Sequence, residues 1–533
     1  MPRIPKLAFL LLPALYAQAP PTATIEGRVY NAQTGDPVRK ARILVRRWNG
    51  RRAEGAYGAT TDAAGRYVID GIEPGVYGVR ATRNGFTAGS YGQRKATGRG
   101  MPLTLAKGQH VRNIDLRLLP QAVVSGSVLD DDNEGIPGVE VVLVSQRYDE
   151  GRRVLSATDS AETDDRGTYR IFGVAPGRYY LAAIYHGELH DQQAETLSEK
   201  LGSYAPVYYP DSLGSPAAAS QLTATPGAEI AGMDFHLRRV HLARVSGRIA
   251  NAPSAASRQV NVMLMSLDGA ELSWGVNKQQ VVDHTGRFAF HDCPPGEYTL
   301  VAQFFAGKQR LSAMMPLTVS NSDIDGLTLN LLHYPDVAGQ VRLEGIDAKM
   351  LPGLGIYLSP MIQQEGVPGA QAEVAADGAF KLSAVAPNRY RLMALRMPDE
   401  AYLKAVRAGG IESPDGIVDF RKGAPADLTV VVSGRGAQLS GKVRNGATVL
   451  LAPDRRDRYD LYKSDVADQT GAFTIKGIAP GPYKLFAFDQ LDTGAWEDPD
   501  FLTPWEKYAQ PIEIHEGDRL TKDLDVIATP PGT

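Results

Sequence analysis

The chain has 533 residues, enough for three to five domains of ordinary size. Hydrophobic residues make up 43% of it and charged residues 22%, a globular composition that excludes a disordered or fibrous protein. The single cysteine excludes a disulfide framework and a multi-cysteine metal site. The formal net charge of −3 is distributed unevenly along the chain.

The first residues have the form of a secretory signal peptide. Arg3 and Lys6 precede an apolar run at 7–16, and small residues follow at 17–19. The run is shorter than the ~20 residues that span a bilayer, and no later segment is apolar for that length. We therefore predict a signal peptide at 1–19, no transmembrane segment after its cleavage, and a location in the periplasm, on the cell surface or outside the cell.

A hairpin pattern recurs five times. In its first copy Asp62 and Gly65 frame a tight turn, Tyr67 begins an alternating strand, and Pro74 starts a second turn before Tyr77. Each copy therefore predicts a β-hairpin with an aromatic residue on each arm. We expect a structural role for the tyrosines of the second arm, which are Tyr77, Tyr179, Tyr298, Tyr390 and Tyr483.

Further short alternating segments surround each hairpin. An upstream strand with a central Gly, as in 25–29, precedes it by about fifty residues, and a final pair of strands closes the unit, as in 102–118. About seven short strands in roughly 100 residues is the size of a β-sandwich, and no stretch has a convincing helical period. The sequence thus predicts an all-β rod of five tandem seven-stranded Ig-like or transthyretin-like sandwiches, at 20–120, 121–240, 241–336, 337–436 and 437–533. The fifth is short before its hairpin, so we expect it to have lost or shortened a strand.

These motifs together resemble the carboxypeptidase regulatory-like domain. The resemblance rests on the Gly-x-Val of the first strand, the Asp-x-x-Gly-x-Tyr hairpin and its Pro-Gly-x-Tyr-x-Leu-x-Ala end, as in 163–183. It implies transthyretin-like sandwiches, also grouped with carbohydrate-binding-like folds, over essentially the whole mature chain. The tandem arrangement is similar to exported proteins of soil bacteria.

The family name invites a peptidase interpretation, which the motifs do not support. A zinc carboxypeptidase needs His-x-x-Glu and a distant His, and none of the nine histidines has Glu three residues later. Cys293 has His284 and His291 nearby, but these are more simply turn and strand residues. The turn aspartates could bind Ca²⁺, although one per turn supplies too few ligands. We therefore predict a protein with no catalytic residue, metal site or cofactor.

The charges separate by repeat. Residues 20–120 hold 17 Lys and Arg against 7 Asp and Glu, whereas residues 121–240 hold 9 against 18. The basic cluster is densest at Arg39, Lys40, Arg42, Arg46, Arg47, Arg51 and Arg52. It is either a solvated face, a surface for an anionic glycan or envelope lipid, or a docking surface for the acidic second repeat. Export argues against nucleic acid as a partner.

Aromatic residues gather in the loops before the final strands of three repeats, at Tyr91, Tyr204, Tyr208, Tyr209, Trp496, Phe501, Trp505 and Tyr508. Aromatic faces suit sugar rings, but the same residues could close the open ends of the sandwiches. Trp496, Trp505 and Tyr508 form the densest group and the first candidate for a stacking surface.

These features predict a non-catalytic exported binding or scaffold protein, with polysaccharide or envelope glycan as the leading ligand. Two alternatives remain open at this point. One is a structural or adhesion spacer that binds other envelope proteins, and the other is an accessory component of an outer-membrane uptake or peptidase system. A sugar binder should place several loop aromatics on one exposed face, whereas a spacer should bury them.

Overall fold

The structure is a computed structural model, and its described residues are 22–48, 56–96, 98–149, 152–185, 203–213, 219–251, 260–266, 278–283, 285–306, 309–361, 369–413, 415–425, 427–489, 491, 494–498 and 500–527. The predicted signal peptide lies outside them. Most of repeat one forms one compact unit, and the rest of the chain forms a second. We number the repeats one to five by the boundaries predicted from the sequence. These boundaries and the rod-like arrangement remain predictions.

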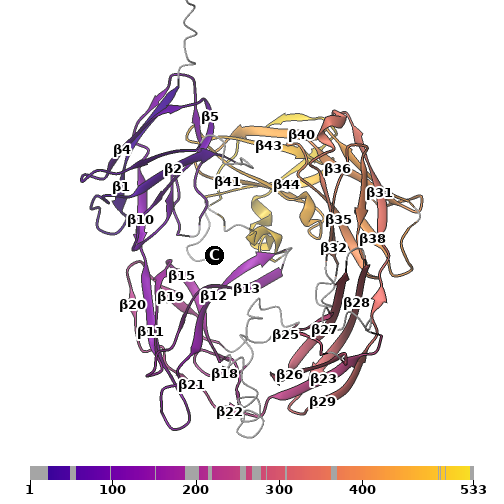
Figure 1. Ribbon diagram of the computed structural model, residues 1–533. Helices are drawn as coiled ribbons and strands as arrows, with labels where there is room; N and C mark the ends of the chain where they lie inside the picture. Colours follow the sequence, from indigo (N-terminus) through magenta and orange to yellow (C-terminus); the bar gives the residue numbers. More distant parts are fainter. Residues whose placement is uncertain are drawn as a thin grey trace, which may run out of the picture. The chain divides into compact units, whose positions relative to one another are not determined.

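The fold is all-β, as predicted (Figure 1). Within the described residues the helical segments are short 3-10 turns, and no helix there is long and apolar enough to cross a membrane.

Repeat one consists of two sheets, with strand orders β4-β1-β10-β6 and β3-β2-β5-β7. Strands β9 and β8 pair with β1 and β5 outside these paths. The strands are β1 (Ala23–Asn31), β2 (Arg42–Arg47), β3 (Tyr57–Thr60), β4 (Arg66–Ile72), β5 (Gly75–Thr82), β6 (Phe86–Thr87), β7 (Gly89–Ser90), β8 (Leu103–Leu105), β9 (His110–Val111) and β10 (Leu116–Pro120).

Repeat two pairs the sheet β14-β11-β20 with the sheet β13-β12-β15-β17-β18, and β16 pairs separately with β22. The strands are β11 (Ala122–Leu129), β12 (Val139–Asp149), β13 (Arg152–Glu162), β14 (Thr168–Val174), β15 (Gly177–Tyr185), β16 (Ser203–Tyr204), β17 (Val207–Tyr208), β18 (Ser212–Leu213), β19 (Leu222–Ala224), β20 (Glu229–Ile230), β21 (Phe235–His236) and β22 (Arg239–Val240).

Repeat three has sheets β26-β23-β29 and β25-β24-β27-β28-β30, and repeat four has sheets β34-β31-β39-β36-β37 and β33-β32-β35-β38. The elements of repeat three are β23 (Ala243–Ile249), β24 (Val260–Ser266), β25 (Lys278–Val281), β26 (Arg287–Cys293), β27 (Gly296–Ala306), β28 (Gln309–Val319), β29 (Ile324–Leu329) and β30 (Leu332–His333). Those of repeat four are β31 (Val337–Glu344), η3 (Ala348–Met350), β32 (Gly355–Pro360), β33 (Ala370–Glu373), β34 (Ala379–Leu382), β35 (Arg389–Leu395), β36 (Tyr402–Ala408), β37 (Ile411–Ser413), β38 (Ile417–Asp419) and β39 (Leu428–Ser433).

Repeat five has sheets β43-β40-β46 and β42-β41-β44-β45. Its elements are β40 (Ala437–Lys442), β41 (Thr448–Pro453), η5 (Tyr459–Leu461), β42 (Lys463–Val466), β43 (Ala472–Ile478), β44 (Gly481–Phe488), η6 (Ala495–Glu497), η7 (Thr503–Tyr508), β45 (Gln510–Ile514) and β46 (Arg519–Thr521). Seven strands are present, and the 3-10 turns η6 and η7 stand between the hairpin and β45.

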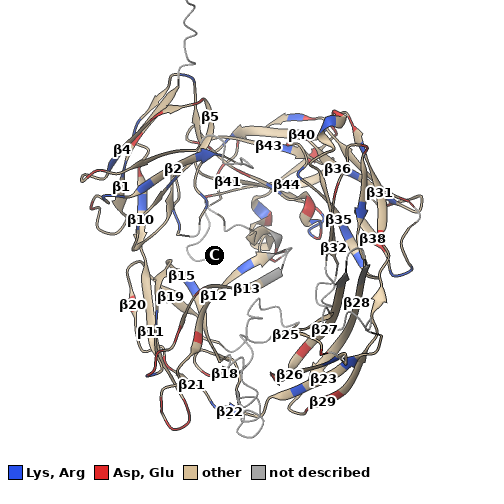
Figure 2. Ribbon diagram, in the orientation of Figure 1, with Lys and Arg blue, Asp and Glu red and all other residues tan. Residues whose placement is uncertain are grey.

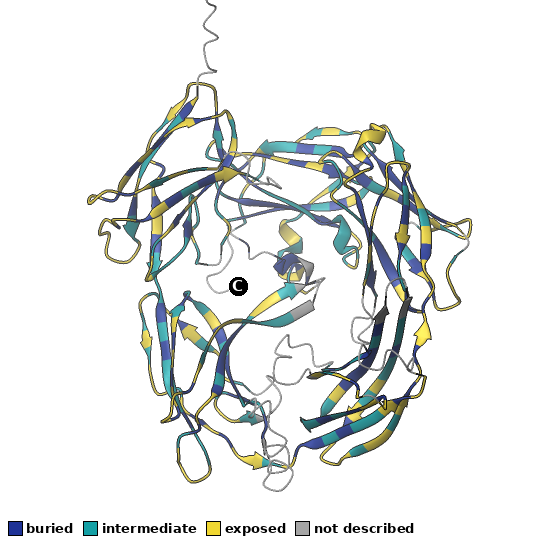
Figure 3. Ribbon diagram, in the orientation of Figure 1, coloured by how far each residue is buried: buried dark blue, intermediate teal, exposed yellow. Residues whose placement is uncertain are grey.

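One topology recurs in all five repeats. The first strand pairs antiparallel with the first hairpin arm and parallel with a strand from the end of the repeat, as β1 does with β4 and β10. The central glycine of the first strand allows this close approach, since a Cβ on Gly27 or Gly441 would overlap the carbonyl oxygen of Ile114 or Lys522. Buried residues form the cores between the sheets (Figure 3).

The hairpins share a bulge at one position. Gly71, Gly173 and Gly477 have φ of 73°, 85° and 63°, and the strand register shifts next to each. Asp292 and Ala384 occupy the same place in repeats three and four with φ of 53° and 51°. The left-handed conformation is therefore a feature of the hairpin, kept even where glycine is absent.

Candidate functional site

The five hairpin tyrosines are buried, each between 0% and 6% exposed. Every hydroxyl donates a hydrogen bond of 2.8–3.1 Å to the carbonyl oxygen four residues earlier, and these acceptors are Glu73, Ala175, Pro294, Ala386 and Ala479. Burial raises the pKa of Tyr179. The rings fix the hairpin from inside and offer no surface to a ligand.

In four of the turns, a carboxylate oxygen of the aspartate accepts hydrogen bonds from the backbone. Oδ1 of Asp62, Asp164, Asp283 and Asp468 accepts hydrogen bonds from the amides two and four residues later, at 2.7–3.1 Å. The Thr168 hydroxyl, which donates to Asp164 Oδ2 at 2.6 Å, and then the two backbone amides hold the pKa of Asp164 below its usual value. Among the described residues no three His, Cys, Asp or Glu are grouped to hold a metal ion.

Cys293 is fully buried in the core of repeat three. Its Sγ lies 3.7 Å from the carbonyl oxygen of Phe290. His284, which the sequence places nearby, is outside the described residues. The thiol therefore packs as a small apolar group.

The loop aromatics of repeats one and two are mostly engaged within the fold. Tyr204 and Tyr208 are 7% and 5% exposed, whereas Tyr91 and Tyr209 are half-buried. Tyr204 contacts Tyr185 edge-on at 5.3 Å between ring centroids, and Tyr209 contacts the core ring of Phe235 at 5.8 Å. The structure therefore does not gather these tyrosines on an exposed face.

The second sheet of repeat five carries a second apolar layer on its outer face. Leu450 and Ala452 of β41 and Phe486 and Phe488 of β44 are buried there, together with Tyr462, Leu491, Trp496 and Leu502. Repeat two has a similar outer cluster at Val142, Val144, Ala182, Ile184 and Tyr208. Aromatic loop residues thus serve as cover for the outer faces of two sheets.

Trp496, Trp505 and Tyr508 do not lie on one surface. Trp496 is 7% exposed inside this layer, Trp505 is half-buried and Tyr508 is 52% exposed. The Trp505 ring meets Phe488 edge-on at 6.0 Å and Tyr508 at 6.4 Å. Between them, Glu506 accepts a 2.6 Å hydrogen bond from Lys484 and pairs with Arg456. Of these three rings, those of Trp505 and Tyr508 keep exposed surface.

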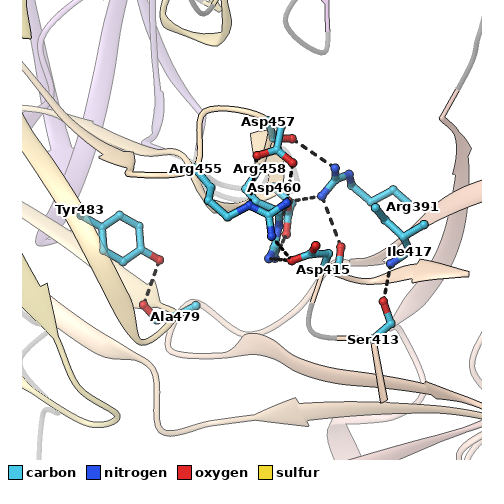
Figure 4. A network of polar contacts seen from close by, with 10 residues as sticks. All are labelled: Arg391, Ser413, Asp415, Ile417, Arg455, Asp457, Arg458, Asp460, Ala479 and Tyr483. Atoms are coloured by element: carbon cyan, nitrogen blue, oxygen red, sulfur yellow. Dashed lines mark hydrogen bonds and ion pairs between the residues drawn. The ribbon is translucent and has the colours of Figure 1, made fainter. Parts of the chain in front are cut away.

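A polar network joins repeats four and five (Figure 4). Arg391 of β35 is 7% exposed, and its guanidinium donates to Asp460 Oδ1 at 3.2 Å and to the carbonyl oxygens of Asp457 and Asp415 at 3.2 and 3.3 Å. In return, Arg455 of repeat five donates to Asp415 Oδ1 at 2.6 Å. A buried guanidinium with partners from both repeats holds the two together.

Two further contacts widen this junction. Glu516 of repeat five accepts hydrogen bonds from the Ser433 hydroxyl at 2.9 Å and the Tyr402 hydroxyl at 3.0 Å. The Gly436 amide donates to the Glu400 carbonyl at 3.0 Å. A Cβ on Gly477 would stand 2.6 and 2.7 Å from the carbonyl oxygens of Asp399 and Ala401, so the bulge of repeat five lies directly against repeat four.

Sequence reasoning missed this junction. Its local signal is the dense alternation of charge in 454–460, which is Asp-Arg-Arg-Asp-Arg-Tyr-Asp. The partner Arg391 stands in an ordinary strand pattern, and nothing in the sequence connects it to residues nearly seventy positions later.

The fold defines a class, proteins built from tandem Ig-like β-sandwiches. The family model of the carboxypeptidase regulatory-like domain matches residues 24–118 and 123–202. These two consecutive segments therefore match carboxypeptidase regulatory-like domains in tandem, a non-catalytic kind of domain. No curated protein matches the chain.

Solved structures to which the chain is similar include two bacterial pilins and the Bacillus anthracis TIE protein. The minor pilin GBS52 of Streptococcus agalactiae has 14% identity and a TM-score of 0.24, with 41% of this chain and 96% of that chain covered. BcpA, the major pilin subunit of Bacillus cereus, has 12% identity and a TM-score of 0.15, with 58% and 99% covered. The Bacillus anthracis TIE protein has 11% identity and a TM-score of 0.16. The match covers 58% of this chain and 51% of that chain, so this chain spans about half the length of the TIE protein.

Proposed function

We propose that the protein is an exported, non-catalytic scaffold that spaces and orients partners at the cell envelope. The signal-peptide form of residues 1–19 supports export. The main support for this proposal is the buried Arg391 guanidinium of repeat four, which donates hydrogen bonds to residues of repeat five. A spacer needs defined angles between its repeats, and buried charge pairs specify one arrangement because a broken pair leaves an unpaired buried charge.

The burial of the loop aromatics supports the same proposal. Tyr204, Tyr208 and Trp496 lie inside apolar layers. They stabilise individual repeats, as a spacer requires, and leave few rings for a ligand.

The rigidity of the junction is tested by distance measurement between spin labels. Lys422→Cys and Lys522→Cys place labels at exposed positions in repeats four and five, and Cys293 is buried and does not compete. We expect a narrow distance distribution that Arg391→Ala broadens. Arg389→Ala, an exposed arginine on the same strand, is the matched control and leaves it narrow. A broad distribution in the otherwise unmodified protein contradicts the scaffold.

A second candidate function is polysaccharide contact through Trp505 and Tyr508. The two rings adjoin, Tyr508 is 52% exposed, and Pro504 reduces the ordering cost of the segment. We expect Trp505→Ala to lose retention on insoluble neutral polysaccharides while the melting temperature stays within a few degrees. A large fall in melting temperature, or no retention of the wild type, excludes this candidate.

A further inference from the structure

The outer face of the second sheet in repeat one is open and basic. Along β2 the side chains of Ile43 and Val45 point into the core, so Arg42, Leu44 and Arg46 point outward. The register places Arg80 of β5 opposite Leu44, between the two arginines. All three arginines are exposed, and none has a carboxylate partner among the described residues.

Among the described residues, no acidic side chain occupies an outward position on the strands of this face. The outward positions paired with β2 on strands β3 and β5 are Gly, Thr and Arg, and those that continue the face on β7 and β8 are Ser and Thr. The arginines therefore project from a surface of small and apolar side chains, the latter including Leu44 and Val76. Lys and Arg of the repeat are blue in Figure 2.

An aromatic ring lies beside these arginines. Trp48 directly follows β2, and its amide donates to the Val76 carbonyl at 2.8 Å. Its ring carbons Cε3 and Cζ3 lie 3.2 and 3.5 Å from the place that a Cβ on Gly78 would take, and Gly78 is the register partner of Arg46. The half-buried indole thus rests on the sheet at the glycine, next to the basic row.

We propose that this face binds an acidic polysaccharide. Guanidinium groups pair with carboxylates or sulfates, and an indole stacks on the C–H face of a sugar ring. An extended polyanion can follow β2, where alternate side chains repeat every ~6.6 Å. This site is separate from Trp505, and it would give the proposed scaffold an attachment point.

A polysaccharide fits these features better than an anionic membrane does. At an anionic lipid surface arginines are held by charge, and a tryptophan contributes by inserting its ring into the headgroup region. The Trp48 ring instead rests against the sheet at Gly78, an orientation that suits stacking on a sugar ring. Binding to vesicles therefore tests the lipid alternative directly.

The test measures binding of the full mature protein to polygalacturonate by affinity electrophoresis at low ionic strength. We expect Arg42→Gln, Arg46→Gln and Arg80→Gln together to weaken binding at least tenfold, and Trp48→Ala to weaken it by severalfold. The matched control combines Arg28→Gln, Arg66→Gln and Lys107→Gln, which remove the same charge from exposed positions elsewhere in repeat one. It should change binding by less than twofold, and all variants should keep the far-ultraviolet circular dichroism spectrum of the folded wild type.

Four results would overturn the proposal. They are no binding by the wild type, equal losses in the two triple variants, full binding by Trp48→Ala, and equal affinity for vesicles of phosphatidylcholine with one quarter phosphatidylglycerol. Retention on neutral polysaccharide tests Trp505 separately, and the spin-label distances test the scaffold, so these failures are distinguishable.

Discussion

Strand β2 of repeat one and strand β41 of repeat five occupy the same place in their sandwiches, but their outward side chains differ. Arg42, Leu44 and Arg46 face out from β2, while the equivalent Thr448, Leu450 and Ala452 of β41 are buried. On the neighbouring strand, exposed Arg80 corresponds to buried Phe486. Both sandwiches use inward apolar positions in the same way. The outward positions decide whether a sheet gains a second apolar layer or remains an open surface.

The largest expected loss of stability comes from truncating a residue of the outer apolar layer of repeat five. Trp496→Ala should destabilise this repeat by about 3–5 kcal/mol, since a large buried aromatic is truncated. Trp48→Ala in repeat one should cost at most about 1 kcal/mol because that ring is half exposed. Several domains do not unfold in one step, so the measurement is hydrogen exchange of each repeat separately. Equal effects would show that the two faces do not differ as described.

Substitution of the hairpin tyrosine, which both sandwiches have, should lower the stability of any repeat. Tyr179→Ala should destabilise repeat two by about 3–5 kcal/mol, because the buried ring and its hydroxyl bond to Ala175 are lost together. Tyr179→Phe removes only the hydrogen bond and should cost about 1 kcal/mol. Hydrogen exchange of the hairpin in repeat two measures both. Unchanged exchange in Tyr179→Ala would place the ring outside the core.

The hairpin bulges offer a more local comparison between the same two repeats. Nothing lies within 4 Å of a Cβ on Gly71, so Gly71→Ala should cost only the ~1–2 kcal/mol of a left-handed alanine. Gly477→Ala adds an overlap with the carbonyl oxygens of Asp399 and Ala401 and should cost at least twice as much. The measurement is hydrogen exchange of the hairpin that contains each glycine. Similar losses would mean that repeats four and five are not packed at this point.

The smallest effect is a pH dependence at the junction. The Ser433 hydroxyl, Tyr402, Arg435 and Lys404 hold the pKa of Glu516 below its usual value. A lowered pKa adds stability above the unfolded-state pKa, ~4.3, and this contribution is lost as pH falls through the lower folded-state pKa. We therefore expect the junction to loosen below about pH 4.3, as faster hydrogen exchange at Gly436. Glu516→Gln should remove this pH step, and an unchanged step would assign it to another group.

The hairpins and their order could be predicted because their signals are local. Asp62, Gly65 and Tyr77 act within a few residues of one another, and alternation shows which side of a strand is apolar. The same reasoning gave an all-β fold. Alternation could not distinguish the inner from the outer apolar layer of repeat five. Val449 and Leu450 point to opposite faces of the sheet, but both belong to one continuous apolar run.

The sequence by itself determined the repeated sandwich, the buried hairpin tyrosines and the uneven charge, since each depends on residue type and short spacing. Only the tertiary structure decided which aromatic residues are covered, that Arg391 meets Asp460, and that Arg42, Arg46 and Arg80 share one face with Trp48. These depend on register and packing between distant segments. A shift of one residue in register would reverse the face of every side chain, so composition and periodicity alone leave them undecided.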